Sequence, residues 1–266
     1  MANVRKTITL TIDGQQVTAA DGTRVIEAAK KLGIDIPHYC YHPSLSVAGS
    51  CRLCLVEVEG MPNLALACDT KVHEGMIVRT NTAKVAHARQ DMLEFLLLNH
   101  PLDCPVCDRG GECILQWYAM DYGSASTRTT EPRRRFRKPR FDPLIELERN
   151  RCILCSRCVR FLDEIAGEHV LGVFQRGNRA HIGTFEDRPI RTIFSGMIID
   201  YCPVGSLTSK PFRFKARAWE LQQVQSTCPY CAAGCPVTLW MRGGAIHRVT
   251  SPTRPGPENR INFHLD

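Results

Sequence analysis

The sequence predicts an α+β protein composed of several small domains, on three observations. Its 266 residues fit one large domain or two to four small ones. Segments with the two-residue period of strands alternate with segments of helical period. The 14 cysteines fall into four separate groups. Because the sequence shows no export signal and disulfides rarely persist in a reducing compartment, these groups imply up to four metal sites.

The first domain is expected over residues 1–80. Residues 7–12 alternate threonine with apolar residues, as in a half-buried strand, and the Asp-Gly pair that follows predicts a tight turn into a second strand near Val17. A helix is expected over residues 25–32, where apolar residues recur at helical spacing. Further strands are expected at residues 55–58, 65–67 and 77–80. This order of elements is typical of a β-grasp-like module.

The second domain is expected over residues 81–123 and is helical. Apolar residues between 85 and 97 form one face of a helix, which His100 and Pro101 end. A helical hairpin around the second group of cysteines should follow.

Residues 124–143 predict an extended connector, because they are rich in serine and threonine and then strongly basic. The basic run at residues 133–140 is interpreted as a solvated segment that lies on acidic neighbours or on a partner subunit. Binding of RNA or lipid is the alternative interpretation of this run.

The third domain is expected over residues 124–222 and has a ferredoxin-like layout. A helix should reach Gly167, with strands near residues 170–174 and 190–194. The last piece, residues 223–266, contains a predicted hairpin over residues 237–250.

Composition narrows the class of protein. Apolar residues make up 44% and charged residues 23%, which excludes wholesale disorder. No apolar run is long enough to span a membrane, so a soluble cytoplasmic protein is expected. The net charge of +7 would favour nucleic acid, but thiolates around three iron–sulfur cores would bring it to about +2. No nucleotide-binding glycine motif is found.

The first group of cysteines predicts a [2Fe–2S] site. Its spacing resembles the plant-type C-x4-C-x2-C…C pattern with a longer first loop. Small residues at 47–50 would let backbone amide groups approach bridging sulfides. A structural zinc site is the alternative, but it would favour two CxxC pairs where this group has one. The four proposed ligands are Cys40, Cys51, Cys54 and Cys68.

The second group has three thiols, one fewer than the four ligands of a [4Fe–4S] cluster. His100 lies at a helix end, four positions before the CxxC pair, and is the candidate for the fourth ligand. The predicted set is His100, Cys104, Cys107 and Cys113.

The third group has the x2, x2 spacing that surrounds three corners of a [4Fe–4S] cluster. In two-cluster ferredoxins the fourth ligand comes from a remote Cys-Pro pair, a role that Cys202-Pro203 fits. The predicted set is Cys152, Cys155, Cys158 and Cys202. The second cluster of that template is lost, because its ligand positions hold Leu162, Thr192, Ser195 and Ile198.

The fourth group, Cys228, Cys231 and Cys235, has no later cysteine in the chain. A [4Fe–4S] cluster there would need another ligand, such as His264 or Asp266. A vestigial or zinc-containing site is the equal alternative.

Together these motifs resemble the large peripheral iron–sulfur subunit of respiratory complex I, the 75 kDa type. The resemblance covers residues from about Lys6 to Trp240 and is carried by NHPLDCPVCDRGGEC and SGMIIDYCPVGSLTSKPFRFKARAWEL. It implies a short form that lacks most of the molybdopterin-like C-terminal domain. It also implies one [2Fe–2S] and two [4Fe–4S] clusters, and leaves a third [4Fe–4S] cluster open.

The function implied by the resemblance is electron transfer in NADH:quinone oxidoreductase. The chain would relay electrons without a catalytic or substrate-binding residue of its own. Its partners would be the NADH/FMN flavoprotein subunit and other iron–sulfur subunits, with no nucleic acid. Membrane contact, on the cytoplasmic face of the inner membrane, would be made only through partners. The alternatives are an iron–sulfur subunit of an NAD-linked hydrogenase or formate dehydrogenase, and, in a different class, a zinc-containing nucleic-acid-binding protein.

Overall fold

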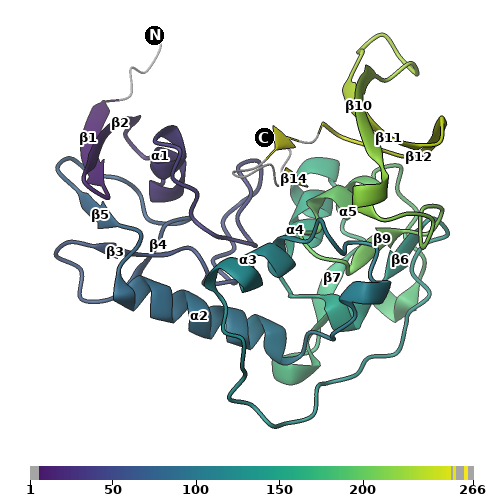
Figure 1. The fold of residues 1–266 in the computed structure, drawn as a ribbon, viewed down its shortest axis with the longest axis horizontal. Coiled ribbons are helices and arrows are strands. Elements are labelled where there is room, and N and C mark those ends of the chain that lie inside the picture. The colour runs from purple at the N-terminus through teal and green to yellow at the C-terminus, as the bar shows by residue number, and fades with distance from the viewer. Residues whose placement is uncertain (1–5, 253, 256–260, 263–266) are drawn as a thin grey trace. The chain divides into compact units, whose positions relative to one another are not determined.

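The structure is a computed structural model that describes residues 6–252, 254–255 and 261–262 (Figure 1). The chain forms two compact units. The first comprises Met1–Tyr41, Val47–Leu96 and Tyr118–Arg128, and the second comprises His42–Ser46, Leu97–Trp117 and Thr129–Asp266. Across the described residues, no helix has the length and apolar character needed to cross a membrane.

The first unit is organised by a five-stranded sheet of order β2-β1-β5-β3-β4. β1 and β2 form the expected antiparallel hairpin, with Leu10 opposite Val17, and the turn at Asp13 and Gly14 has positive φ at both residues. β1 and β5 are parallel, with Ile12 beside Val78. The elements are β1 (Thr7–Ile12), β2 (Gln15–Ala20), α1 (Val25–Lys31), β3 (Leu55–Val58), β4 (Ala65–Leu66) and β5 (Ile77–Arg79).

One apolar core lies between this sheet and α1. It contains alternate residues of β1, the buried residues of α1 and the inward residues of β3 and β5. Cys54 and Cys68 belong to the same core and are fully buried. The first group of cysteines is therefore built into the main apolar core of this unit.

Two helices flank the second group of cysteines. α2 (Ala83–Leu98) precedes it and α3 (Ile114–Tyr122) follows it, with the short 3-10 helix η1 (Cys104–Val106) between them. The helix expected before His100 is confirmed, whereas the helical hairpin expected after it is represented by the short η1 and by α3.

The second unit contains short elements joined by long loops. β6 (Ile145–Leu147) pairs with β9 (Leu207–Ser209), and β7 (Gly172–Phe174) pairs with β8 (His181–Gly183). The remaining elements are η2 (Arg149–Arg151), α4 (Arg157–Arg160), η3 (Phe161–Ala166), η4 (Gly177–Arg179), η5 (Phe185–Asp187), α5 (Met197–Tyr201), η6 (Ala218–Glu220), β10 (Gln222–Thr227), β11 (Pro236–Arg242), β12 (Ala245–Thr250), β13 (Arg254–Pro255) and β14 (Ile261–Asn262).

The strand predicted at residues 190–194 is wrong. β7 instead pairs with β8, at residues 181–183. Ile190 is buried and donates its backbone N–H to the carbonyl of Phe141, while the residues after it turn toward α5. Apolar character at Ile190 reflects burial in an irregular segment, which a two-residue period cannot distinguish from a strand.

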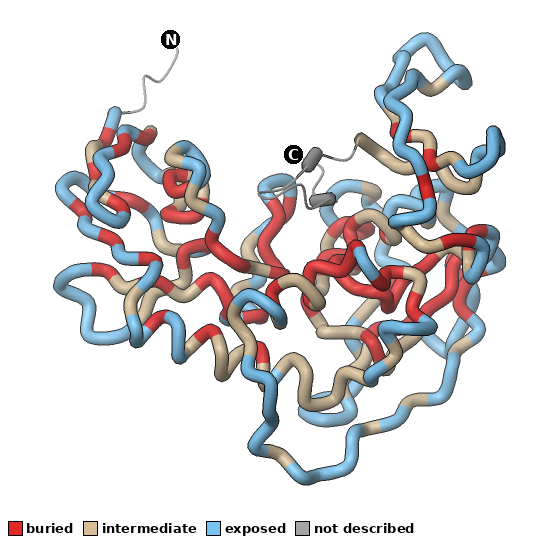
Figure 2. The backbone as a smooth tube through the Cα atoms, viewed as in Figure 1, coloured by how far each residue is buried: buried red, intermediate tan, exposed pale blue. Residues whose placement is uncertain are grey.

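The basic connector is a largely exposed loop without regular secondary structure (Figure 2). Lys138 contacts Glu146, and the Arg134 guanidinium lies over the ring of Phe136. The first contact joins the connector to an acidic residue outside it, whereas the second lies within the connector.

Residues 222–250 form a three-stranded antiparallel sheet of order β10-β11-β12. Trp240 of β11 is fully buried and packs with Phe212, Ala216 and Leu221. The predicted hairpin over residues 237–250 corresponds to β11 and β12.

We predict that Ile12→Ala destabilises the first sheet by about 2–5 kcal/mol, because Ile12 is 0% exposed and its removal leaves a cavity. Ile77→Ala is the matched control: it deletes the same side-chain atoms on neighbouring β5, where Ile77 is 38% exposed, and should cost less than about 1 kcal/mol. Hydrogen exchange of the β1 amide groups in the full chain measures the difference. Equal exchange rates in the two variants would contradict the proposed core.

Candidate metal centres

The first unit brings the four thiols of the first group together in its core. The Sγ atoms of Cys40 and Cys51 are 3.4 Å apart. Hydrogen bonds between thiols lower the pKa of Cys40 beside Cys51 and Cys68, and lower the pKa of Cys54 beside Cys68. The same contacts raise the pKa values of Cys51 and Cys68, with burial acting in the same direction. The four sulfur atoms thus form one connected group.

Backbone amide groups point at this sulfur group. The N–H of Tyr39 donates to Cys51 Sγ at 3.5 Å, and the Leu53 amide lowers the pKa of Cys51 in the same way. Arg52, inside the CxxC loop, has a φ of +53°, which turns the loop amides inward. Four buried thiols surrounded by N–H donors are the donor set of a thiolate-bound cluster.

The second group lies on the loop between α2 and α3. Cys107 and Cys113 are buried, whereas Cys104 is exposed. Burial raises the pKa of Cys113 to about 12 and also raises the pKa of Cys107. Gly110 allows the tight turn, because a Cβ there would lie 2.8 Å from the carbonyl oxygen of Cys104.

His100 has the protonation state of a metal ligand. Burial lowers its pKa to about 4, and the positive charge of Arg151 acts in the same direction. The imidazole is therefore neutral at pH 7, and a neutral ring nitrogen can bind metal. Nδ1 is buried and has no hydrogen-bond partner among the described residues, while the backbone of Arg151 forms a hydrogen bond with the ring. A buried nitrogen without a partner is costly, so a ligand role fits this residue.

The third group surrounds a common cavity. Cys152, Cys155, Cys158 and Cys202 all line it, together with apolar side chains such as Leu147, Ile182 and Leu207. Cys202 follows α5, so the structure brings it to the three earlier thiols across 50 positions of sequence.

The burial of four neighbouring thiols in the third group favours a positively charged metal core between them. Burial raises the pKa of Cys152 to about 12 and raises the pKa of Cys158 well above its usual value, with the other thiols adding to both effects. Four thiolates could not share this apolar space without compensating positive charge. Leu154 and Ser156 have φ values of +54° and +58°, and the Leu154 amide donates to Cys152 Sγ at 3.4 Å.

The turn that carries Cys202 also contacts the second group. Cys113 Sγ is 4.0 Å from the carbonyl oxygen of Pro203. The backbone of Gly205 passes so close to Cys107 that a Cβ at this position would lie 2.1 Å from the Cys107 sulfur. Residues 202–205 therefore contact both predicted [4Fe–4S] sites.

The fourth group lies on the exposed loop between β10 and β11. Cys228 donates its backbone N–H to the carbonyl of Cys235 at 2.8 Å, which closes the loop. Cys231 and Cys235 are exposed. The candidate fourth ligands His264 and Asp266 lie outside the described residues. Within the described ranges, no group of three or more His, Cys, Asp or Glu side chains is arranged to hold a single metal ion.

Cysteine spacing did not identify three residues that shape these sites. Gly205 allows contact with Cys107, and the Arg151 guanidinium pairs with Asp103, between His100 and Cys104. Arg109 donates to the backbone carbonyl of Cys202. Gly205 follows the Cys-Pro pair closely, and Arg109 and Arg151 lie close to ligand cysteines in the sequence, so each could have been noticed. Their contacts could not be predicted, because the partners are remote in sequence.

Four family models match the chain, in the order of its thiol groups. They are the 2Fe-2S iron-sulfur cluster binding domain (residues 5–83), the NADH-ubiquinone oxidoreductase-G iron-sulfur binding region (89–128), the NADH-quinone oxidoreductase subunit 3 ferredoxin-like domain (142–208) and the molybdopterin oxidoreductase Fe4S4 domain (221–263). The chain therefore has mixed α/β content with ferredoxin-like iron–sulfur domains of both the 2Fe-2S and the 4Fe-4S kind.

A solved structure also resembles the chain. A chain in the crystal structure of NAD+-reducing [NiFe]-hydrogenase in the H2-reduced state matches with a TM-score of 0.72 and 30% identity, over 79% of this chain and 90% of that chain.

Curated relatives match over nearly the whole chain. The G subunit of NADH-quinone oxidoreductase from Rickettsia bellii is 44% identical over 91% of this chain and 36% of its own length. The 78 kDa subunits of mitochondrial NADH-ubiquinone oxidoreductase from Candida albicans and Neurospora crassa are 45% and 46% identical over 91% of this chain, and 34% and 33% of their own lengths. The chain thus spans about a third of these relatives, and it belongs to the family that comprises the G subunit of NADH-quinone oxidoreductase and the mitochondrial 78 kDa subunit.

Proposed function

We propose that this chain is an electron-transfer subunit of NADH:quinone oxidoreductase. It passes single electrons from an NADH/FMN flavoprotein subunit toward the quinone-reducing part of the complex. The observation that carries the proposal is the turn at residues 202–205, which contacts the thiols of two separate groups. A relay needs redox centres that are close together and shielded from water, and this turn joins two such sites.

The proposal includes three ligand sets. Cys40, Cys51, Cys54 and Cys68 hold a [2Fe–2S] cluster; His100, Cys104, Cys107 and Cys113 hold a [4Fe–4S] cluster; Cys152, Cys155, Cys158 and Cys202 hold another. Bound clusters of these kinds supply reversible one-electron transfer. The chain itself buries most of these thiols, with Cys104 exposed, and directs amide N–H groups at Cys51 and Cys152.

The proposal includes a β-grasp topology for the first sheet and four successive domains at residues 1–80, 81–123, 124–222 and 223–266. The strand order β2-β1-β5-β3-β4, with β1 parallel to β5, supports the topology. The four family matches follow the same succession.

The loop of Cys228, Cys231 and Cys235 adds a candidate third [4Fe–4S] site. Its backbone closure between Cys228 and Cys235 supports a metal-binding loop. The match to a molybdopterin oxidoreductase Fe4S4 domain supports a cluster over zinc.

The partners in this proposal are the flavoprotein subunit and other iron–sulfur subunits. The chain would lie at the cytoplasmic face of the inner membrane and contact it only through those partners. It would contain no substrate site of its own.

A second assembly is favoured by one observation. The hydrogenase chain is matched over 90% of its length, whereas the curated relatives from NADH-quinone oxidoreductase are matched over about a third. An NAD-linked hydrogenase would use the same relay with a different electron partner. Affinity purification of the tagged full chain from its own cells separates the two assemblies, since quinone-module subunits support complex I and a nickel-containing subunit supports the hydrogenase.

The cluster assignment predicts about 10 iron and about 10 sulfide ions per chain, or about 14 of each if the fourth loop is loaded. Iron, sulfide and zinc assays of anaerobically purified protein measure this. Stoichiometric zinc with little iron would end the electron-transfer proposal.

Cys202→Ser should remove or open the third cluster, because Cys202 lines the same cavity as the other three thiols. We expect a loss of up to about 4 irons per chain and of one EPR signal. Cys231→Ser is the control, since Cys231 is exposed on the fourth loop and should leave the third signal unchanged. An unchanged third signal in Cys202→Ser would refute this ligand assignment.

Gly205→Ala should disrupt the second cluster. Its Cβ would meet Cys107 Sγ at 2.1 Å, so the ligand or the turn must move. Gly196→Ala is a matched control, because a Cβ there meets nothing within 4 Å. We expect a loss of iron and of the second cluster's EPR signal in Gly205→Ala alone. If Gly205→Ala keeps its full iron content and its EPR signals, the close contact between the Gly205 backbone and Cys107 does not matter for the second cluster.

A further inference from the structure

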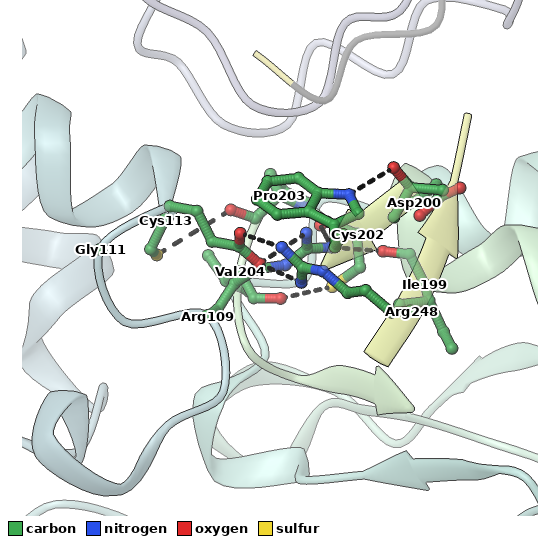
Figure 3. Close-up of polar contacts among 12 residues, drawn as sticks. Arg109, Gly111, Cys113, Ile199, Asp200, Cys202, Pro203, Val204 and Arg248 are labelled. Carbon is green, nitrogen blue, oxygen red and sulfur yellow. Dashed lines mark hydrogen bonds and ion pairs between the residues drawn. The ribbon is translucent and has the colours of Figure 1, made fainter. Parts of the chain in front are cut away.

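Arg109 connects the two predicted [4Fe–4S] sites. It lies in the ligand loop of the second site, between Cys107 and Cys113, and is only 4% exposed. Its guanidinium donates to the carbonyl oxygens of Ile199, at 2.5 Å, and Cys202, at 3.0 Å (Figure 3). A side chain from one ligand loop therefore holds the backbone of a ligand in the other site.

Two guanidinium groups and a buried carboxylate lie close together at Arg109. Glu112, which is 2% exposed, lies 3.7 Å from the Arg109 guanidinium. Arg248 of β12 also binds Glu112, through two hydrogen bonds of 2.8 and 2.6 Å. One buried carboxylate is thus shared by two guanidinium groups.

Asp200 is a further acidic group near Arg109 and Arg248, and it accepts a hydrogen bond from Ser251 at 3.3 Å. Arg248 in turn stacks 3.9 Å from the ring centre of Trp240, which fixes the outer end of the network.

Arginine suits this position better than lysine. Its rigid, planar fork can donate to two carbonyl groups and still face a carboxylate. Lysine would keep the charge, but its single ammonium group cannot reproduce that set of fixed contacts.

We infer that Arg109 is a positioning residue that couples the two [4Fe–4S] sites: it fixes the Cys202 turn and places a positive charge beside both, which raises both reduction potentials. This inference rests on the proposed function. Net charge and hydrogen bonding near a cluster set its potential, because a nearby cation stabilises the reduced, more negative state.

The test is an EPR-monitored redox titration of the full-length protein, with iron content measured for each variant. Arg109→Gln should shift the midpoint potentials of both [4Fe–4S] clusters to more negative values and leave the [2Fe–2S] potential unchanged. Arg109→Lys should restore most of the potential while leaving altered EPR line shapes, because the charge returns without the second nitrogen that faces Glu112. Glu112→Gln should shift both potentials in the positive direction.

Arg89→Gln is the matched control. Arg89 is 5% exposed and donates to the carbonyl of Leu55 in the first unit, so this variant also removes a buried guanidinium. It should leave both [4Fe–4S] potentials unchanged.

Unchanged potentials in Arg109→Gln with full iron content would overturn the inference. If Arg109→Gln loses iron, the inference is tested on Arg109→Lys and Glu112→Gln instead. Unchanged midpoint potentials and unchanged EPR line shapes in both of these variants would overturn the inference. Failure of the proposed function is distinguishable, because the unmodified protein would then lack the iron and the EPR signals from the outset.

Discussion

The burial of thiol groups against one another is the constraint on which the rest of this structure depends. Isolated thiols in an apolar interior stay protonated, as the raised pKa values of Cys113 and Cys152 show. Several thiolates can share such a space only around a positive core. This fold brings thiols from remote segments together, and irregular loops direct amide groups at several of them.

Local and remote contacts contribute differently to the sites. The CxxC loops are local: residues at positive φ, such as Arg52 and Leu154, turn neighbouring amides toward sulfur. The turn at residues 202–205 is remote, since it touches Cys107 and Cys113 about a hundred positions earlier. The spacing of cysteines within a loop indicates the kind of cluster, whereas the turn at residues 202–205 brings two groups of thiols close together. Electron transfer between clusters requires this proximity as much as it requires the right kind of cluster.

The sequence predicted the elements whose signal is local. The hairpin of β1 and β2 and the helix before His100 were predictable from periodicity and turn residues. The assembly of the Cys152 group with Cys202 followed from a ferredoxin template and agrees with the shared cavity, though its ligand role awaits the substitution test. The strand predicted near Ile190 was wrong, because burial there comes from an irregular segment. Arg109 could not be predicted, since its acceptors lie 90 and 93 positions away.

The two units differ in what can stabilise them. The first unit has a five-stranded sheet with a continuous apolar core, so much of its stability comes from the burial of apolar side chains. In the second, β6, β7, β8 and β9 have three residues each, and such strands bury little surface. Metal binding contributes directly to folding free energy where the ligands come from separate segments. In the second unit the buried Arg109–Glu112–Arg248 network adds polar contacts that fix the orientation of segments remote in sequence.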